Sequence, residues 1–379
     1  MDSATPISVP LVSIIIPARN EEASLELCLR SLVVQKGVSF EILIVNDAST
    51  DGTRSIAESF TRVRQCPFIG LNQSLLDVQV IDAPQPLPAG WTGETNALVA
   101  GETAARGQWL LFTDAHTEHL EGSLAAAVAE AEQHHADLLS YAPEQLLTGF
   151  RQQLLMPLIF GELAMRYSPR RVSDPAAPDA AASGQYLLVR AAAHRQVGGF
   201  RQVASELLAD MALARLYKQQ GRTIRFRFGR GLVRSRMYRT ADDLNRSCTR
   251  TLALLFPNAR ELARKRSQEF RRLLLSLLIA PAWTLYYFTH AGVPGDWFWP
   301  AMISLFWFFT LIGFAGFYVR VARAGFPFVP TVLSVLGLRS FAALLRQSAK
   351  AYEEGIVSWR GREYHTAGAR IRSAASNVE

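Results

Sequence analysis

The spacing of apolar residues alternates between two periods along the first 143 residues. Short apolar runs rich in β-branched side chains predict buried strands at 12–17, 40–45, 78–81 and 109–113. The intervening segments place apolar residues at helical spacing, which predicts helices at 22–34, from Thr53 onward and at 94–105. Apolar strands that alternate with helices predict an α/β fold with a mostly parallel sheet covered on both faces.

The pattern between residues 170 and 238 is less regular. Residues 170–183 are rich in Pro, Ala, Asp and Ser, and this composition predicts a mobile loop of the kind that forms a lid. Helical spacing returns from 205 to 220, and arginines punctuate the apolar residues from 223 to 238. We therefore expect a helix followed by a pair of strands.

Beyond residue 240 the chain becomes basic and then strongly apolar. Residues 241–272 form a basic amphipathic stretch, which we expect to lie at the membrane interface. The segments 273–289 and 297–319 are each about long enough to cross the roughly 30 Å hydrocarbon core of a bilayer. A buried helix pair in a soluble protein is the alternative, but the clustered Trp and Phe residues at 297–308 favour a membrane. We therefore predict a membrane region at 273–346.

A third apolar segment, 326–345, is interrupted by Arg339. A charge at mid-bilayer costs about 3 kcal/mol on an insertion scale, so we expect a re-entrant or interfacial helix here. The alternative is a third full span, which would place the basic C-terminal tail, 347–379, outside the cell.

The charge of the chain also indicates a membrane partner. Forty Lys and Arg against 33 Asp and Glu give a formal net charge of +7, and the excess lies beside the apolar segments. This favours anionic lipid headgroups over nucleic acid, and the positive-inside rule makes the flanks of the two spans cytoplasmic. Residues 1–10 lack the features of a cleavable signal peptide. We therefore expect a multi-pass protein of the cell (inner) membrane whose first domain is cytoplasmic.

The three cysteines do not indicate a metal or redox site. Cys28, Cys66 and Cys248 stand far apart in the sequence, without the spacing of either kind of site. We expect free thiols in a reducing compartment.

Asp114-Ala115-His116 is the most informative polar cluster in the chain. It follows the apolar run 109–113, at the strand end where open α/β sheets bind their ligands. A carboxylate and an imidazole at this spacing can hold a divalent cation, and that cation can hold a diphosphate. The triplet therefore indicates an enzyme that uses a nucleotide-activated donor.

Three further polar segments stand at the same predicted edge of the sheet. They are Pro-Ala-Arg-Asn-Glu-Glu at 17–22, Asn-Asp-Ala-Ser-Thr-Asp-Gly-Thr at 46–53 and Glu-Leu-Leu-Ala-Asp at 206–210. In this order, with the triplet, they resemble family-2 glycosyltransferases over Val12 to about Tyr238. The resemblance implies a GT-A (nucleotide-diphospho-sugar transferase) fold, a Rossmann-like mixed, mostly parallel sheet, over residues 1–240. C-terminal transmembrane helices would follow it.

The resemblance assigns a donor site. Asp47 would accept a hydrogen bond from the ring N–H of uracil, while Pro17, Asn20 and Glu21 would line the same nucleotide pocket. Asp114 would contribute to nucleotide-sugar binding and, with His116, would ligate Mn²⁺ or Mg²⁺. The family usually has Asp at the third position of this triplet, and an imidazole there suits Mn²⁺ somewhat better. A solvent-facing histidine is the alternative.

The resemblance also assigns the chemistry of transfer. Asp210 would be the general base, since inversion at an anomeric carbon requires a carboxylate to take the acceptor's proton. Compensation of a helix dipole is the alternative for Asp210. Arg236 would stabilise the leaving diphosphate by charge-assisted hydrogen bonds, or else belong to a lipid-facing patch. Two positions depart from the family pattern, since Ala209 replaces a common first acid and Glu94 a common lysine.

The sequence therefore predicts a metal-dependent, inverting glycosyltransferase. It would move a sugar from a nucleotide-diphosphate donor, most simply a UDP-sugar, to a lipid or lipid-linked acceptor. Residues 359–364, Trp-Arg-Gly-Arg-Glu-Tyr, resemble a tail motif of membrane members that include carotenoid- and hopanoid-associated enzymes. The alternatives are a non-catalytic membrane partner with a degenerate fold and a nucleotidyltransferase, although the latter's glycine-rich loop does not follow the first strand.

Overall fold

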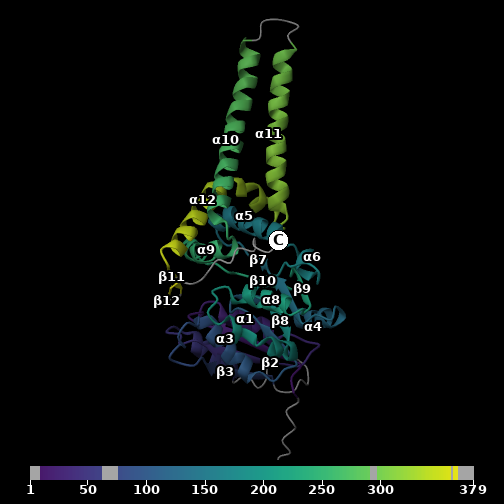
Figure 1. Cartoon of the computed structure of the whole chain (residues 1–379), viewed down its shortest axis with the longest axis vertical. Coiled ribbons are helices and arrows are strands. Elements are labelled where there is room, and N and C mark those ends of the chain that lie inside the picture. The colour runs from purple at the N-terminus through teal and green to yellow at the C-terminus, as the bar shows by residue number, and fades with distance from the viewer. Residues whose placement is uncertain (1–8, 62–75, 291–296, 360–361, 366–379) are drawn as a thin grey trace, which may run out of the picture. The chain divides into compact units, whose positions relative to one another are not determined.

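The chain folds into two compact units. The computed structural model describes residues 9–61, 76–290, 297–359 and 362–365 (Figure 1). One unit comprises Met1–Leu146 and Tyr167–Met237, and the other comprises Leu147–Arg166 and Tyr238–Glu379. Helix α5 (Phe150–Arg166) therefore groups with the C-terminal unit, although it lies inside the 1–240 domain expected from the sequence.

A seven-stranded sheet forms the centre of the first unit, with strand order β3-β2-β1-β4-β8-β6-β9. Its strands are β1 (Val12–Ala18), β2 (Phe40–Asn46), β3 (Asp77–Asp82), β4 (Trp109–Phe112), β6 (Leu138–Ala142), β8 (Leu187–Arg190) and β9 (Ile224–Phe228). Strand β8 runs antiparallel to both of its neighbours, and the other described pairs in this sheet are parallel. The predicted mixed, mostly parallel sheet is confirmed.

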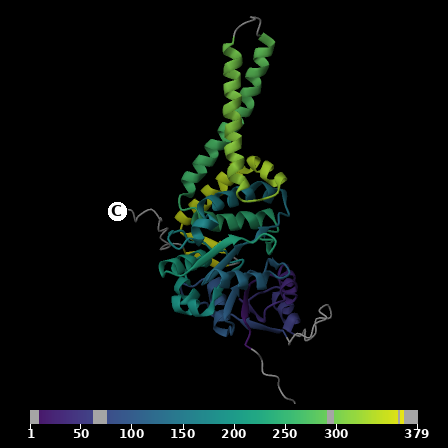
Figure 2. The same ribbon diagram turned by 90° about the vertical axis from the view of Figure 1, so that its right-hand side faces the viewer.

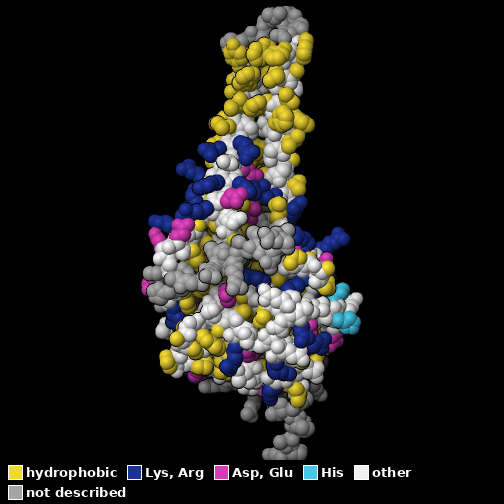
Figure 3. Space-filling view, viewed as in Figure 1, with side chains coloured by type: hydrophobic (Ala, Val, Ile, Leu, Met, Phe, Trp, Pro, Cys, Tyr) yellow, Lys and Arg dark blue, Asp and Glu magenta, His cyan; other side chains and the backbone are white. Residues whose placement is uncertain are grey.

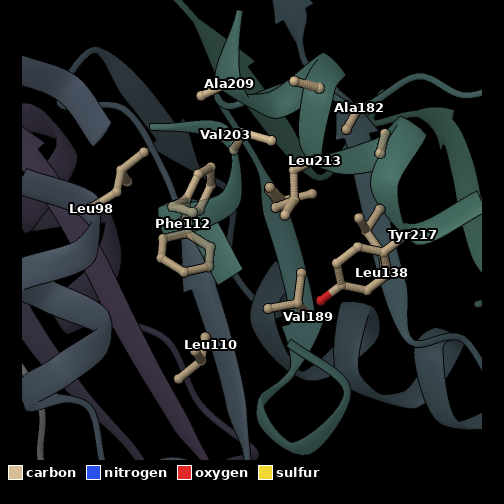
Figure 4. Packing of buried hydrophobic residues seen from close by; sticks show 14 of the residues in the cluster. Leu98, Leu110, Phe112, Leu138, Ala182, Val189, Val203, Ala209, Leu213 and Tyr217 are labelled. Atoms are coloured by element: carbon tan, nitrogen blue, oxygen red, sulfur yellow. The ribbon is translucent and has the colours of Figure 1, made fainter. Parts of the chain in front are cut away.

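Alternate side chains along the central strands enter two separate apolar cores. Ile14 and Ile16 of β1 pack on one face with α1 (Leu25–Val33), α2 (Thr53–Thr61) and α4 (Ser123–Gln133). Ile15 packs on the other face with α3 (Gly93–Ala104), α7 (Ala191–Val197), the 3₁₀ helix η1 (Gly199–Val203) and α8 (Ala209–Gln219). Figure 4 shows part of this second core, with Phe112 of β4 and Leu213 of α8. Helices on both faces explain why the central strands are apolar throughout.

The segment 170–183, predicted to be a mobile lid, lies partly in the core. It begins within α6 (Pro169–Ser173), where Val172 is fully buried. Ala180, Ala181 and Ala182 are buried in the same cluster as α8, and Figure 4 shows Ala182 among its members. The loop prediction is wrong for the helical and buried parts, because small alanine side chains pack as readily in a core as they occur in loops, whereas residues 174–178 form a largely exposed turn.

A small second sheet lies in the same unit. Its strands are β5 (Thr117–His119), β7 (Glu144–Gln145) and β10 (Val233–Ser235), with β10 in the centre. Strand β10 is antiparallel to β5 and parallel to β7. This sheet joins the segment after Asp114 to the arginine-rich segment near residue 234.

The second unit is helical. It contains α5, α9 (Ala241–Leu255), α10 (Ala259–His290), α11 (Phe298–Ala322) and α12 (Phe328–Glu353), and ends with the hairpin strands β11 (Ile356–Trp359) and β12 (Arg362–His365). Helix α9 begins at a capping box in which Thr240 and Asp243 satisfy each other's backbone N–H groups.

Within the described residues, three helices are long and apolar enough to cross a membrane: α10, α11 and α12. Helices α10 and α11 lie side by side in both ribbon views (Figures 1 and 2). Trp307 of α11 donates a hydrogen bond to Thr284 of α10 over 3.0 Å. Apolar side chains cover most of this pair, while Lys and Arg gather at one end of it (Figure 3). The link between the two helices, 291–296, falls outside the described residues.

Charged side chains meet at the basic end of this pair. Glu162 of α5 lies 3.0 Å from Arg266 and 3.3 Å from Arg320, and Glu269 accepts hydrogen bonds from both arginines. All four are largely buried, and burial raises the pKa of Glu162 even though the two arginines oppose that shift. The four charges satisfy one another within the protein, and they lie where the apolar surface of α10 and α11 gives way to basic side chains.

Candidate functional site

The carboxyl ends of β1, β2 and β4 bring the predicted donor residues to one edge of the sheet. Strand β1 pairs with β2 on one side and with β4 on the other. The direction of chain crossover reverses between β1 and β4, and ligands bind outside such a switch point. Pro17 lies within β1, Asp47 directly follows β2, and Asp114 follows β4 after one residue.

Asp47 is held in a buried position at this edge. Its exposed fraction is 4%, and its backbone N–H donates to Ala18 at the end of β1 over 2.9 Å. Arg19 donates to the Asp47 carbonyl over 2.6 Å, and its guanidinium lies 3.9 Å from the carboxylate. Gln85 approaches the other carboxylate oxygen over 3.4 Å. Neighbours from the loops after β1 and β3 thus orient this carboxylate.

Asn20 joins the loops that follow β1 and β2. Its backbone has a positive φ of 55°, a conformation that asparagine tolerates better than most residues. Its side-chain oxygen accepts from the N–H of Thr50 over 2.9 Å, and its own N–H donates to Ser49 over 3.2 Å. Asn20 is therefore a residue that shapes this edge of the site.

Glu21 is buried beside the same loops. Its N–H donates to the Thr53 hydroxyl over 2.7 Å. The Cys28 sulfur lies 3.7 Å from the Asp114 carbonyl oxygen. Burial raises the pKa of the Cys28 thiol, and the charges of Asp114 and Glu21 raise it further, so the thiol stays protonated. Both carboxylates, Asp114 and Glu21, act on this thiol because they lie at the same end of the sheet.

Asp114 and His116 converge. The His116 Nε2 atom lies 3.5 Å from an Asp114 carboxylate oxygen, and both side chains are partly exposed. His116 Nδ1 lies 3.2 Å from the buried hydroxyl of Ser235 on β10. This contact orients the ring as partners of metal-bound histidines do, so His116 is not simply a solvent-facing side chain.

The residues present fit a cation only in part. Across the described parts of the chain, no three His, Cys, Asp or Glu side chains gather as a complete metal site. Asp114 and His116 supply two ligand atoms at a separation that one ion can bridge, since octahedral ligands at 2.0–2.1 Å stand about 3 Å apart. A diphosphate that contributes further oxygens would complete such a site.

Asp210 stands in the first turn of α8, with both carboxylate oxygens bound by backbone. Gly184 donates to one oxygen over 2.8 Å, and Met211 donates to the other over 2.7 Å. The loop that carries Gly184 is tied to β4, because Thr113 donates to the Gln185 carbonyl over 2.8 Å. These bonds connect Asp210 to the residue that immediately precedes Asp114.

Arg236 reaches the same region through its backbone. Its N–H donates to the His116 carbonyl over 3.2 Å, and its side chain is exposed. Glu206, by contrast, precedes α8 and is exposed, so the predicted helix start at 205 lies four residues too early. In the tail motif at 359–364, Arg360 and Gly361 fall outside the described residues.

Comparison with known families shows to which family the domain with strands β1, β2 and β4 belongs. The family model described as Glycosyl transferase family 2 matches residues 13–196, from β1 into α7. These residues form a family-2 glycosyltransferase domain. The family-2 match includes Pro17, Asn20, Glu21, Asp47, Asp114 and His116, and it ends before Asp210 and Arg236.

Individual relatives of the family-2 domain are distant. A 4,4'-diaponeurosporenoate glycosyltransferase of Staphylococcus aureus (strain MRSA252) is 25% identical over 60% of this chain and 56% of its own length. An uncharacterized protein of Mycobacterium tuberculosis (strain CDC 1551 / Oshkosh) is 40% identical over 19% of this chain and 26% of its own. The chain thus spans about half or less of these curated relatives.

A solved structure shares the fold of the family-2 domain. The mannosyltransferase PcManGT from Pyrobaculum calidifontis, in complex with GDP-Man and Mn²⁺, superimposes with a TM-score of 0.51 at 17% identity. The comparison covers 91% of this chain and 88% of that one. The superposition shows that the two proteins share a GT-A-like fold, and at 17% identity it shows the fold alone.

Three features of the site were missed by sequence reasoning. The Gly184 N–H, the Ser235 hydroxyl and the Arg19 guanidinium hold Asp210, His116 and Asp47, respectively. Arg19 lies in the polar segment 17–22, Ser235 lies in the arginine-rich segment 223–238, and Gly184 lies in a glycine-containing turn. Their roles depend on pairing across the fold, which only the structure supplies.

Proposed function

We propose that this protein is an inverting glycosyltransferase that moves a sugar from a UDP-sugar to a lipid or lipid-linked acceptor at a membrane. The observation that carries the proposal is the hydrogen-bonded path from Asp210 through Gly184 and Gln185 to Thr113, beside Asp114. The path joins Asp210, the candidate base, to the edge of the sheet that would bind a nucleotide diphosphate. Asp210 and Asp114 stand almost a hundred residues apart in the sequence.

The donor would bind with its base at the β1 and β2 loops and its diphosphate at the β4 loop. The Asp47 carboxylate would accept the uracil N–H, and Glu21 and Pro17 would border the base. The exposed guanidinium of Arg236 would bind the diphosphate oxygens, because its backbone is fixed at His116.

Asp114 and His116 would hold a divalent cation against the diphosphate, with Ser235 orienting the imidazole. A bound cation neutralises the charge that develops on the departing diphosphate. Support comes from the fold neighbour of Pyrobaculum calidifontis, which carries Mn²⁺ with its nucleotide sugar.

Asp210 would take the proton from the acceptor hydroxyl or carboxyl group as that oxygen attacks the anomeric carbon. The backbone donors Gly184 and Met211 each bind a different oxygen of this carboxylate. These two bonds fix the rotamer of the base before the acceptor arrives, so little orientational freedom remains to be lost in the transition state.

A lipid acceptor follows from the helices that flank the domain. Helices α10 and α11 would anchor the enzyme, so an acceptor in the same bilayer would stay close to the site. The Staphylococcus relative is named for a carotenoid acid, which is itself a lipid-soluble molecule. The basic end of the α10–α11 pair would lie on the cytoplasmic side, as the positive-inside rule requires.

Replacing Asp47 with alanine is expected to weaken UDP binding about 10- to 100-fold. This equals the loss of a hydrogen bond to a charged group, roughly 1.5–3 kcal/mol. Isothermal titration of purified protein with UDP would measure it. Asp77→Asn is the matched control, because Asp77 begins β3, away from the carboxyl ends of the strands. This variant should leave the affinity for UDP unchanged. Equal affinities for Asp47→Ala and wild type would remove Asp47 from the donor site.

The proposed reaction is tested by following label from donor to lipid. Membranes that contain the protein would be incubated with radiolabelled UDP-glucose, UDP-N-acetylglucosamine or GDP-mannose, and lipids extracted. We expect label in a lipid product with inverted anomeric configuration, from a UDP-sugar, and none in membranes without the protein. Transfer with retention, or hydrolysis without any labelled lipid, would contradict the proposal.

A further inference from the structure

Helix α12 has one exposed stripe that changes character along its length. Near its N-terminus the stripe is apolar, with Phe328 81%, Val329 58% and Leu336 60% exposed. Farther along, the exposed residues include three basic side chains, and the acidic Glu353, which pairs with Arg260 of α10, ends this side of the helix. The whole set, called here the α12 stripe, is Phe328, Val329, Val332, Leu336, Arg339, Ser340, Ala343, Arg346, Gln347 and Lys350. Steps of three and four residues place them on one side of the helix.

The opposite side of α12 packs against other helices of the same unit. Gly337 lies so close to α5 that an added Cβ would collide with the Leu154 carbonyl oxygen. Leu338, which follows Gly337 in the helix, is fully buried. In the most apolar window of α12, 44% of residues are buried, compared with 11% in α10 and in α11. Much of α12 therefore faces protein rather than lipid.

Specific bonds fix the C-terminal part of α12 to polar segments. The Ser348 hydroxyl accepts from the Ala253 N–H of α9 over 2.9 Å, and the Tyr352 hydroxyl donates to the Arg250 carbonyl over 2.7 Å. Arg346 donates to Ser267 over 3.0 Å, in the charged part of α10 that precedes its apolar run. The part of α12 from Arg346 onward is therefore bound to the polar parts of α9 and α10 rather than exposed to lipid tails on this side.

The apolar portion of the α12 stripe is too short to cross, because the exposed Arg339 and Ser340 follow it. Residues 328–336 carry the apolar portion of the stripe, and at 1.5 Å per residue they span about 13 Å. A bilayer core is roughly 30 Å thick. The Tyr318 hydroxyl donates to the Val332 carbonyl over 3.2 Å, which places this portion level with the last turns of α11. It therefore begins where the proposed span ends.

We infer that α12 is an interfacial helix that binds the surface of an anionic bilayer with the α12 stripe. The apolar portion inserts at the boundary between acyl chains and headgroups, and the basic portion lies along the headgroup phosphates. The inference rests on the proposed membrane attachment through α10 and α11. Its consequence is that the chain crosses twice, so the segment after residue 353 lies on the same side as the segment before 259.

Label depth in the intact protein tests this inference. Single p-acetylphenylalanine substitutions at Val332, Leu336, Ser340 and Gln347 would carry a nitroxide, and the native cysteines stay in place. The full chain would be reconstituted in vesicles of neutral lipid with about 30% phosphatidylglycerol, which supplies an anionic surface. Collision with oxygen and with a nickel chelate then gives the depth of each label. Leu311, exposed in the middle of α11, is the reference for a crossing helix.

We expect labels at 332 and 336 about 5–10 Å deep, labels at 340 and 347 in headgroups or water, and the label at 311 near the bilayer centre. A label at 340 as deep as that at 311 would show that α12 crosses. Aqueous labels at 332 and 336 would show that the stripe does not bind lipid. An aqueous label at 311 would contradict the membrane attachment itself. The depth at 336 should also decrease in vesicles of neutral lipid alone, and an unchanged depth would remove the role of the basic portion.

Discussion

Replacing Asp210 with asparagine should lower kcat for sugar transfer by about 10²- to 10⁴-fold, the usual contribution of a positioned general base. Asparagine keeps the size of the side chain and one oxygen acceptor, but it cannot take the acceptor's proton. Donor affinity should change little, because the carboxylate is assigned to the acceptor rather than to the nucleotide. Transfer from labelled UDP-sugar to lipid measures kcat, and UDP titration measures binding.

Two controls separate chemistry from structure in this experiment. Glu206→Gln removes an exposed carboxylate just before α8, and its kcat should match that of the wild type. The asparagine variant can satisfy only one of the two N–H donors, Gly184 and Met211, with its oxygen. Thermal unfolding in detergent therefore accompanies the assay. A folded Asp210→Asn protein with wild-type kcat would place the base elsewhere.

Chelation of divalent cations should abolish transfer, and substitutions at the β4 loop should change the response to added metal. Asp114→Asn removes the charged ligand, and binding of Mn²⁺ in the presence of UDP should fall below detection in an electron paramagnetic resonance titration. His116→Asp replaces a nitrogen ligand with oxygen, which Mg²⁺ prefers. This variant should shift the ratio of activities with Mg²⁺ and Mn²⁺ toward Mg²⁺.

Glu118→Gln is the matched control for the metal experiments, since Glu118 lies on β5 close in sequence to both ligands. Its Mn²⁺ affinity and metal preference should equal those of the wild type. Full activity in chelator, together with Mn²⁺ binding unaffected by Asp114→Asn, would show that the enzyme handles its diphosphate with side chains alone.

The parallel half of the sheet could be predicted because its strands are apolar throughout. The runs that became β1, β2 and β4 are bounded by polar residues, and their burial on two faces leaves a plain signal. Strand β8 gave no comparable signal, because its four residues pair antiparallel with β4 and β6, far apart in sequence. Its place in the sheet is a tertiary effect that a local pattern does not contain.

The C-terminal helices show the same difference between features that a local pattern predicts and features that depend on tertiary contacts. Composition alone predicted α10 and α11, whose side chains face outward along most of their apolar parts. It could not predict that α5 joins the C-terminal unit, because residues 167–237 of the first unit separate α5 from the rest of that unit in the sequence. Contacts such as that of Gly337 with Leu154 leave no periodic trace in either segment.

At the site, the residues with distinctive chemistry were predictable and their supports were not. Asp47 and Asp114 stand at strand ends, where an acidic residue is conspicuous. The donors that orient them and their neighbours are ordinary groups, such as the Gly184 N–H and the Ser235 hydroxyl. Their importance arises from position in space, which residue type does not encode.

A structure of the protein with UDP and Mn²⁺ bound tests most directly whether distant side chains form one donor site. We predict the uracil against Asp47, the ion bound by Asp114 and His116 together with diphosphate oxygens, and Asp210 facing the space beyond the diphosphate where the sugar would lie. UDP bound away from Asp47, or an ion that contacts neither Asp114 nor His116, would contradict the account.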